Sequence, residues 1–317
     1  MPADSQTQAT RPRTAAPPVS FRHRMQDRVI GGLIWLVLRL PYRQRLAAMG
    51  WLAARVVAPL IGWRRRVRGN LALVFPDMPQ AEVERLVRAV PDNFGRTLIE
   101  LFSPTELSAQ ARATPIEGPG LAAVEAAQAA GRPVIITTAH LGNYDAARAA
   151  LLARGFPLGA LYMPMTNPTF NRRYVAAMEA IGTPLFPRGR EGLGGMLRHL
   201  RDGGMLALVI DQHMGHGEML DFMGKPARTA LSAAELALKF KADLIPGYCI
   251  RQPDGISFRI EAEAPIPHGD PVVMTQAIND SVAAQVRAHM DQWLWMHRRW
   301  KDPGDELELT AADDPVP

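Results

Sequence analysis

The stretch PVIITTAHLGNYDAARAALLA, residues 133–153, decides the fold. It begins with a short run of apolar and β-branched residues, 133–138, which is typical of a strand that is buried on both faces. A segment of helical periodicity follows at 143–153. A buried strand that leads directly into a helix is the repeating unit of α/β proteins with a parallel sheet.

Further along the chain, short apolar runs continue to alternate with segments of helical periodicity. The strands predicted there lie at 158–163, 183–186, 205–210 and 244–250, followed by an edge strand at 256–261. The helices predicted there lie at 171–180, 192–200, 232–240 and 274–290. An earlier helix is predicted at 81–90, with a longer version that extends through Glu100. This alternation predicts an α/β fold with a mostly parallel central sheet and helices on both faces.

The first 70 residues carry most of the positive charge. The whole chain has a formal charge of +5, yet residues 21–70 contain 11 arginines and a single acidic residue, Asp27. Apolar runs at 29–38 and 46–63 lie between these arginines and contain three tryptophans. Arginine and tryptophan beside apolar runs are typical of helices at an anionic membrane surface. We therefore predict membrane-associating helices at 21–69, in front of the α/β domain.

Other interpretations of this basic segment stay open. Its helices could be ordinary amphipathic helices that cover the core of the domain. The run 29–38 is too short for a hydrocarbon core of about 30 Å, so a spanning helix would need residues 25–45. Nucleic-acid binding is not expected, because apolar residues separate the arginines and no zinc-finger or aromatic-basic sheet motif is present. No small-x-small site follows the apolar run, so we expect no cleaved signal peptide.

The composition divides the chain into four parts. We predict a disordered lead at 1–20, the basic helices at 21–69, one α/β domain at 70–303 and a tail at 304–317. The lead is rich in Pro, Ala, Thr and Gln and shows no apolar periodicity. Cys249 is the only cysteine, so the chain can form no internal disulfide.

Residues that can do acid–base chemistry follow directly after the first predicted strand. His140 comes at the exit of the strand 133–138, and Asp145 follows in the first turn of the next predicted helix. Asp145 could accept the Nδ1 proton of His140 and leave Nε2 free to take a proton from a hydroxyl group. The motif contains no Ser or Cys, so direct attack by a bound hydroxyl is favoured over a covalent intermediate. Alternatively, His140 caps the helix and Asp145 is a first-turn acid favoured by the helix dipole.

Three other polar residues follow predicted strands. Asp211 and Gln212 directly follow the strand 205–210, and Arg188 follows the strand 183–186. Reactive groups gather beyond the carboxyl ends of parallel strands, so Asp211 and Gln212 could position a substrate. Arg188 could bind an anionic group through paired hydrogen bonds. The alternatives are a helix or loop cap for the first two residues and a salt bridge for Arg188.

Two motifs that suggest a metal or a nucleotide are weak. His213 and His216 share a loop with Asp211 and Glu218, and these side chains could in principle hold a metal ion. Because H-x-x-H on a loop has no matching half-site here, we expect no metal. The glycines at 189–195 lack the Lys-Ser/Thr of a P-loop, so we expect no nucleotide cofactor.

Aromatic and basic residues close the predicted domain. Trp293, Trp295 and Trp300 lie next to Arg298 and Arg299. We expect the tryptophans to pack a terminal helix against the core and the arginines to lie near the membrane. We assign these residues no chemistry.

Several short motifs occur in the order found in a known enzyme family. They are Asn70-Leu71 with Phe75-Pro76, AHLGNYD at 139–145, Asn167-Pro168 with Arg172, Phe186-Pro187-Arg188, Asp211-Gln212, FMGKPA at 222–227 and QWLWMHRRWK at 292–301. With them the chain resembles the lipid A secondary acyltransferases, the lauroyl and myristoyl transferases. These belong with the glycerol-phosphate acyltransferase-like enzymes, which share an H-x-x-x-x-[DE] dyad. The resemblance runs from the arginine-rich head to Lys301.

The resemblance implies a membrane-bound O-acyltransferase without a cofactor. Such an enzyme moves a fatty acyl chain from a thioester of acyl carrier protein or coenzyme A to a hydroxyl of a 3-hydroxyacyl chain on a lipid A precursor. It works at the cell inner membrane, with its catalytic domain on the cytoplasmic face. His140 would be the general base and Asp145 its orienting partner. The expected substrate contacts are Asn143, Arg188, Asp211 and Gln212.

This sequence departs from the family pattern in two places, and rival functions stay open. Relatives often have Glu where Asp145 stands, and they more often show another acid and fewer histidines after Gln212. The same chemistry could serve another lipid acceptor, such as a lysophospholipid, an ornithine lipid or a glycolipid. The chain could also be a non-catalytic lipid-binding protein of the same fold. A soluble hydrolase would need a nucleophile that the sequence near His140 does not provide.

Overall fold

A seven-stranded sheet forms the centre of the computed structural model, which describes residues 20–301. The strand order is β1-β9-β8-β2-β5-β3-β4, and every neighbouring pair is parallel except β8 with β9. The strands are β1 (Ile116–Glu117), β2 (Val134–Thr138), β3 (Leu158–Tyr162), β4 (Leu185–Pro187), β5 (Met205–Val209), β8 (Asp243–Arg251) and β9 (Phe258–Ala262). The predicted α/β fold with a mostly parallel sheet is confirmed.

The differences from the predicted strands lie at the border of the sheet and in a separate hairpin. The strand predicted at an edge, β9, is not an edge strand, because β1 pairs with its outer side. The two residues of β1 are too few to show a pattern in the sequence. The strands β6 (Glu218–Phe222) and β7 (Lys225–Thr229) form a separate antiparallel pair, and neither was predicted.

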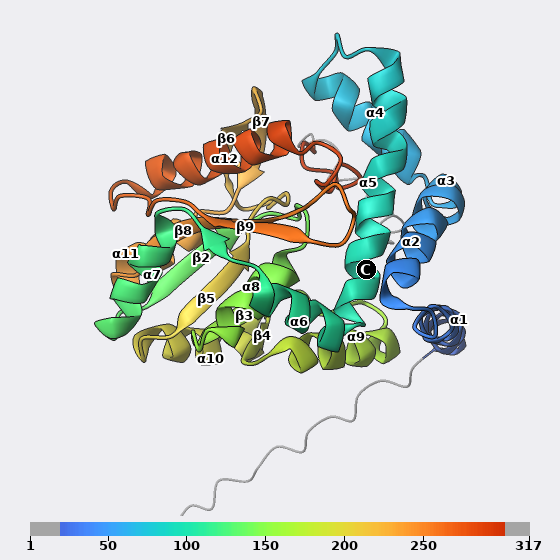
Figure 1. The fold of residues 1–317 in the computed structure, drawn as a ribbon. Coiled ribbons are helices and arrows are strands. Elements are labelled where there is room, and N and C mark those ends of the chain that lie inside the picture. Colours follow the sequence, from blue (N-terminus) through green and yellow to red (C-terminus); the bar gives the residue numbers. More distant parts are fainter. Residues whose placement is uncertain (1–19, 302–317) are drawn as a thin grey trace, which may run out of the picture.

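Helices cover both faces of the sheet (Figure 1). On one face lie α6 (Pro104–Ala113), α7 (Gly120–Ala129) and α8 (Tyr144–Ala153). On the other face lie α10 (Arg190–Arg201), α11 (Ser232–Phe240) and α12 (Pro271–Ala288). The helix α9 (Pro168–Ile181) packs beside α6, α8 and the first helix of the chain. Alternate residues of each central strand point to the two layers, which explains the continuous apolar runs in the sequence.

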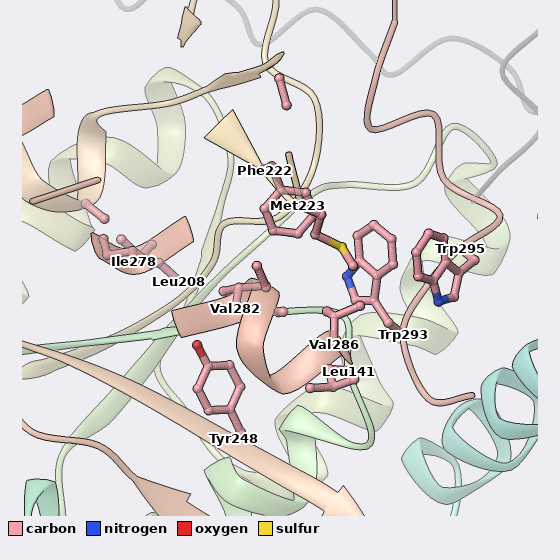
Figure 2. Packing of buried hydrophobic residues seen from close by; sticks show 14 of the residues in the cluster. Leu141, Leu208, Phe222, Met223, Tyr248, Ile278, Val282, Val286, Trp293 and Trp295 are labelled. Atoms are coloured by element: carbon pink, nitrogen blue, oxygen red, sulfur yellow. The ribbon is translucent and has the colours of Figure 1, made fainter. Parts of the chain in front are cut away.

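The residues after α12 fill the larger core through tryptophan side chains (Figure 2). Trp293 and Trp295 are at most 1% exposed, and their rings meet edge to face at 4.7 Å. Packing of these rings against the core is confirmed, but they lie in turns rather than in a terminal helix. Arg299 is fully buried, so its side chain does not face a membrane, whereas Arg298 is half-buried and its place near a membrane stays a prediction.

The head of the chain is a set of short helices packed on a long one. It consists of α1 (Phe21–Val37), α2 (Tyr42–Leu52), the π-helical segment η1 (Ala53–Val57), α3 (Ala58–Leu60) and α4 (Trp63–Val74). Of these, α2, η1 and α4 pack on α5 (Gln80–Leu101), whereas α1 packs on α9 and α2 (Figure 1). The longer of the two predicted versions of α5, through Glu100, is therefore the correct one.

The predicted spanning segment 25–45 is not one helix. The helix α1 ends at Val37, and Pro41 precedes a new helix at Tyr42. No single helix within residues 20–301 is long and apolar enough to cross a bilayer; only Tyr42–Leu60 and Trp63–Val74 together reach that length and composition, with an 86° bend between them. The predicted lead at 1–20 and tail at 304–317 fall almost wholly on residues 1–19 and 302–317, which lie outside the described part of the chain. The domain boundary at 69/70 stays a prediction.

Candidate active site

Two parallel strands bring the candidate catalytic residues together at the carboxyl edge of the sheet. Residue Thr138 at the end of β2 is in register with Val209 at the end of β5. His140 lies two residues beyond Thr138, and Asp211 lies two residues beyond Val209. Because both residues lie two positions beyond strand ends that are in register, their side chains lie next to each other.

Asp211 holds His140 at both its backbone and its ring. The Nδ1 atom of His140 lies 2.7 Å from Oδ1 of Asp211, and the backbone N–H of His140 donates to Oδ2 at 2.8 Å. The indole Nε1–H of Trp293 donates to the same Oδ2 at 2.7 Å. The Asp211 side chain is 2% exposed, whereas that of His140 is 24% exposed. The carboxylate is therefore enclosed, and the ring it holds is open to the surface.

The surroundings of Asp211 keep its carboxylate ionised. Burial alone would raise the pKa of Asp211, but the attraction of His140 and the hydrogen bonds from His140 and Trp293 outweigh burial and lower the pKa to about 2. An ionised Asp211 accepts the Nδ1 proton of His140, so Nε2 is the ring nitrogen that can take a proton from a hydroxyl. This is the hydrogen-bonding arrangement of a general base and its orienting carboxylate.

The prediction that Asp145 accepts the Nδ1 proton is wrong. Asp145 is buried in the first turn of α8, where its Oδ1 accepts from Nε of Arg148 at 3.3 Å. Arg148 in turn donates to the carbonyl oxygens of Met178 and Gly182 at the end of α9. Asp145 thus ties α8 to α9. The position that the spacing motif assigns to it beside His140 is taken by Asp211 from the neighbouring strand.

The turn after His140 is held in place by contacts with three other segments of the chain. Gly142 has φ of +60°, and a Cβ there would lie 1.9 Å from the carbonyl oxygen of Cys249, so only glycine fits. The Gly142 N–H donates to the carbonyl of Gln292, and its carbonyl accepts from Oγ1 of Thr97 on α5. The position of His140 therefore depends on β8, on the turns after α12 and on α5 together.

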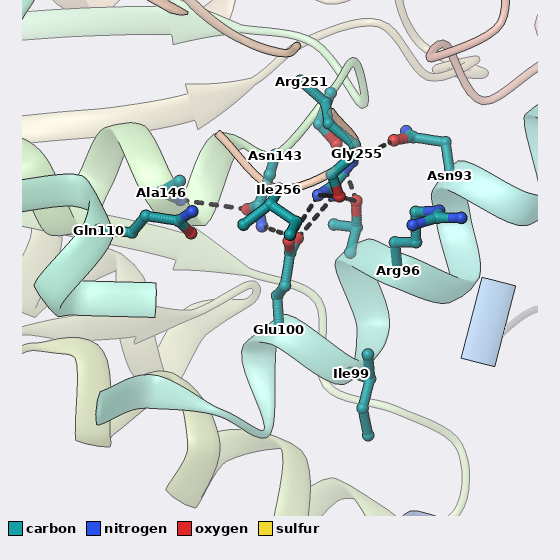
Figure 3. A network of polar contacts seen from close by, with 12 residues as sticks. Asn93, Arg96, Ile99, Glu100, Gln110, Asn143, Ala146, Arg251, Gly255 and Ile256 are labelled. Atoms are coloured by element: carbon teal, nitrogen blue, oxygen red, sulfur yellow. Dashed lines mark hydrogen bonds and ion pairs between the residues drawn. The ribbon is translucent and has the colours of Figure 1, made fainter. Parts of the chain in front are cut away.

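The prediction that Asn143 contacts the substrate does not fit its surroundings. Asn143 is 1% exposed and is the N-cap of α8, where its Oδ1 accepts from the Ala146 N–H. Its Nδ2 donates to Oε2 of Glu100 at 2.6 Å (Figure 3). Its side-chain contacts serve the start of α8 and the long helix behind it, and its backbone N–H donates to the carbonyl of Cys249 on β8. Asn143 is a structural residue of the turn.

A buried ion pair lies behind Asn143 (Figure 3). Glu100 on α5 is fully buried and receives two hydrogen bonds from Arg251 at the end of β8, at 2.5 and 2.6 Å. The Nε of Arg251 donates to Oδ1 of Asn93, and its Nη2 lies 3.2 Å from Oγ1 of Thr97. This pair was not predicted from the sequence, because its members are separated by about 150 positions and neither belongs to a local motif.

The remaining predicted substrate contacts lie around the same edge. Arg188 follows β4 and is exposed, and its Nη2 lies 3.6 Å from the sulfur of Met214. Gln212 follows Asp211 and is half-buried, and its carbonyl accepts from Arg299 at 3.4 Å. Both side chains stay available for a bound molecule, so their roles in binding remain predictions.

The closing motif, residues 292–301, also reaches the surroundings of Asp211, through the indole of Trp293 and the nearby imidazole of His297. Within residues 20–301 no group of three or more His, Cys, Asp and Glu side chains is arranged to hold a metal ion. Arg299 donates to Oγ1 of Thr229 and the carbonyl of Arg228, both at 2.6 Å, and burial lowers its pKa to about 10. Burial also lowers the pKa of His297 to about 4, while the charge of Asp211 acts against this shift.

The only cysteine offers no nucleophile. Cys249 is fully buried within β8, and burial raises the pKa of its thiol far above the ordinary value. A thiol that stays protonated is a poor nucleophile. The arrangement around His140 therefore supports proton removal from a bound hydroxyl, which then attacks its partner directly.

Comparison with known proteins identifies the family of this chain. The family model for the bacterial lipid A biosynthesis acyltransferases matches residues 20–302. The chain belongs to this family. The resemblance to the lauroyl and myristoyl transferases is thus confirmed, and the chain is an acyltransferase.

The relatives in this family are distant but nearly full-length. The phosphatidylinositol mannoside acyltransferase of Mycobacterium tuberculosis (strain CDC 1551 / Oshkosh) is 25% identical over 80% of this chain and 87% of its own. The lipid A biosynthesis acyltransferase of Haemophilus influenzae is 24% identical, covering 87% and 89% of the two chains. The lipid A biosynthesis lauroyltransferase of Escherichia coli K12 is 26% identical, covering 85% and 89%.

Proposed function

We propose that this acyltransferase moves a fatty acyl chain from an acyl thioester to a hydroxyl of a 3-hydroxyacyl chain on a lipid A precursor. The observation that carries the proposal is the His140–Asp211 pair, since it joins an enclosed carboxylate to a surface-accessible imidazole. The family and its lipid A-modifying members support the class of acceptor. Acyl carrier protein is the donor we expect, with coenzyme A as the alternative carrier.

In the proposed mechanism the acceptor hydroxyl loses its proton to Nε2 of His140. The hydroxyl oxygen attacks the thioester carbonyl carbon, and collapse of the tetrahedral intermediate breaks the carbon–sulfur bond. The proton held by His140 passes to the departing thiolate, which leaves as a thiol. Asp211 stays ionised throughout, fixes the Nδ1 tautomer and stabilises the imidazolium while it carries the proton. No acyl group is attached to the enzyme in this sequence.

We propose that the enzyme works on a membrane surface, at the cytoplasmic face of the inner membrane. The head exposes large apolar side chains at 57–79% of their surface, namely Phe21, Val29, Trp35, Leu36, Trp51 and Leu60. Arginines lie among them, and the guanidinium of Arg39 stacks 3.8 Å above the ring of Trp35. Exposed apolar groups beside arginines suit binding in the plane of an anionic leaflet. The inner faces of the same helices pack on α5 and α9.

The acceptor has one rival that the comparisons specifically favour. The mycobacterial relatives are named phosphatidylinositol mannoside acyltransferases, and they match about as well as the lipid A enzymes. A glycolipid hydroxyl is therefore the second candidate. The chemistry at His140 would be the same for both acceptors.

The test combines cells and purified protein. Mass spectrometry of lipid A from a strain that lacks this protein should show the loss of one secondary acyl chain. Purified protein should acylate a lipid A precursor in preference to a mannosylated glycolipid when both are present. An unchanged lipid A pattern without a redundant enzyme, or preference for the glycolipid, contradicts the proposed acceptor. Comparing acyl carrier protein and coenzyme A thioesters in the same assay identifies the donor.

A further inference from the structure

An arginine-rich groove lies between the head and the α/β domain. It has a volume of about 1050 Å³ and runs between α2, η1 and α5 on one side and the residues after β8 and α12 on the other. This is at the upper end of the volumes usual for ligand sites. Six arginines but only two acidic residues line it, together with Trp51 at its rim. A concave surface with this excess of guanidinium groups attracts an anion.

In the described part of the chain, two of these arginines form no hydrogen-bonded ion pair, although Arg88 is close enough to Glu84, one turn earlier on α5, to help lower the pKa of that carboxyl group. Arg55 on η1 and Arg88 on α5 are exposed, and within residues 20–301 no carboxylate forms an ion pair with either. Arg96 and Arg259 pair with Asp92 and Glu261, which leaves their charge partly compensated. Arg55 and Arg88 are therefore the residues with hydrogen-bonding capacity left for a ligand.

The opposite wall of the groove contacts the turn that follows His140, residues 140–143, which we call the catalytic turn. Gln292 lines the groove, and its carbonyl accepts from the Gly142 N–H in the turn that follows His140. Arg251 also lines the groove, but both of its terminal nitrogens are bound to Glu100. The groove and the catalytic turn are thus separated by a single layer of residues.

One exposed apolar side chain of the head, Trp51, lines the groove. Trp51 is 59% exposed at the rim, and Leu60 and Ile61 further along the same helical segment are 79% and 42% exposed. A groove that carries positive charge and opens beside apolar side chains matches a molecule with an anionic head and a hydrocarbon body.

We propose that this groove binds the phosphate of a membrane lipid headgroup through Arg55 and Arg88. The proposal rests on the membrane location given under the proposed function and extends it to a defined site. The planar guanidinium groups bind two phosphate oxygens each, which a lysine ammonium group cannot do. A bound headgroup would hold the chain at the bilayer with the catalytic turn close to the surface.

The test measures binding of the full chain to vesicles without any reaction. Phosphatidylcholine vesicles are prepared with phosphatidic acid or, at matched surface charge, with phosphatidylserine. We expect the wild-type chain to prefer phosphatidic acid. R55Q/R88Q should weaken binding to these vesicles by about 10- to 30-fold, since each arginine near an anionic surface contributes about 1 kcal/mol. R198Q/R201Q removes two exposed arginines from α10 and should change binding less than twofold.

A charge-conserving variant distinguishes specific binding of a phosphate group from general attraction to a negatively charged surface. R55K/R88K should still bind anionic vesicles but lose the preference for phosphatidic acid, because lysine keeps the charge and not the paired hydrogen bonds. An unchanged preference in R55K/R88K, or equal losses in R55Q/R88Q and R198Q/R201Q, overturns the proposal. So does intact vesicle binding by R55Q/R88Q combined with a raised KM for an acyl carrier protein thioester, which would make the groove a donor site.

The result is independent of the proposed reaction. H140A should bind vesicles like the wild-type chain, since His140 does not line the groove. Headgroup-selective binding without any acyl transfer to a lipid A precursor would contradict the proposed acceptor and leave the groove assignment intact. Acyl transfer to a lipid A precursor without headgroup selectivity would contradict the groove assignment and leave the proposed acceptor intact.

Discussion

Asp211 and Glu100 are both buried carboxylates near the catalytic turn, but they face different partners. Asp211 binds His140, whose side chain is 24% exposed, and Glu100 binds Arg251, whose side chain is 5% exposed. One pair has a partner that can gain and lose a proton and reach a substrate. The other pair is closed on both sides and holds α5, β8 and α8 together. Burial of a carboxylate alone therefore does not distinguish the candidate catalytic pair from the structural pair; the exposure of the partner side chain does.

The largest expected effect comes from changing His140 and Asp211, the two members of the first pair, one at a time. H140A should lower kcat by about 10²- to 10⁴-fold, the usual contribution of general base catalysis. It should also lower the free energy of unfolding, because the buried Asp211 carboxylate loses its ring partner, so the rates are compared on protein shown to be folded. D211N should have an effect of similar size, because the asparagine amide would donate to Nδ1 and leave the proton on Nε2. The rates are measured with purified protein at saturating donor and acceptor.

Asp145 supplies the control for this experiment. D145N weakens the contact to the buried Arg148, so it should unfold more easily while keeping its kcat. If a folded D145N loses as much kcat as H140A, Asp145 rather than Asp211 acts with His140 during the reaction.

The outcome for Asp145 shows where the sequence stops being informative. The strands β2 and β5, and the residues at their carboxyl ends, could be predicted from local apolar runs. Their adjacency could not, since the order of strands in a sheet is set by packing of the whole domain. Spacing along the chain therefore favoured Asp145, five residues from His140, over Asp211, which is 71 residues away but comes from the neighbouring strand.

Two other residues show the same limit in different ways. A local rule was available for Asn143, because Asn between a strand and a helix is a common N-cap. For Trp293 no local rule exists, since its indole reaches Asp211 only through the fold of the turns after α12. Local backbone chemistry can be anticipated from sequence, whereas contacts between distant segments require the assembled core.

The second pair should respond in stability rather than in chemistry. E100A leaves the guanidinium of Arg251 buried without its carboxylate, which should lower the free energy of unfolding by about 3–5 kcal/mol. E84A removes the exposed ion pair in which Arg68 donates two hydrogen bonds to Glu84. This variant should change the free energy of unfolding by less than about 1 kcal/mol. Urea denaturation compares the two. Equal stability of E100A and E84A would contradict a structural role for the buried pair, and E100L/R251M should recover part of the loss.

Acid titration separates the groups around His140 by pH window. The pKa of His297 is lowered from 6.5 to about 4, so the unfolded chain binds its proton first, and stability falls as the pH drops from about 6.5 to 4. The pKa of Asp211 is lowered from 3.8 to about 2, so its contribution is present above pH 3.8 and is lost as the pH falls toward 2. Unfolding free energies are measured across both windows. His289 also has a lowered pKa, and so do Asp254, Glu82 and Glu84, so the upper step should become smaller in H297Q and the lower step smaller in D211N rather than vanish. An unchanged upper step in H297Q would mean that another group titrates there.

The smallest expected effect isolates a single hydrogen bond to Asp211. W293F removes the indole N–H that donates to its ionised carboxylate, and a bond to a charged group contributes about 1.5–3 kcal/mol. W295F is the matched control, because its indole donates to the neutral carbonyl of Met290 and should contribute about 1 kcal/mol. W293F should also raise the pKa of Asp211, so the acid step in its stability should move to higher pH, and that of W295F should not. If both variants lose the same stability and neither shifts the acid step, Trp293 acts only through packing, and Asp211 is held by His140 alone.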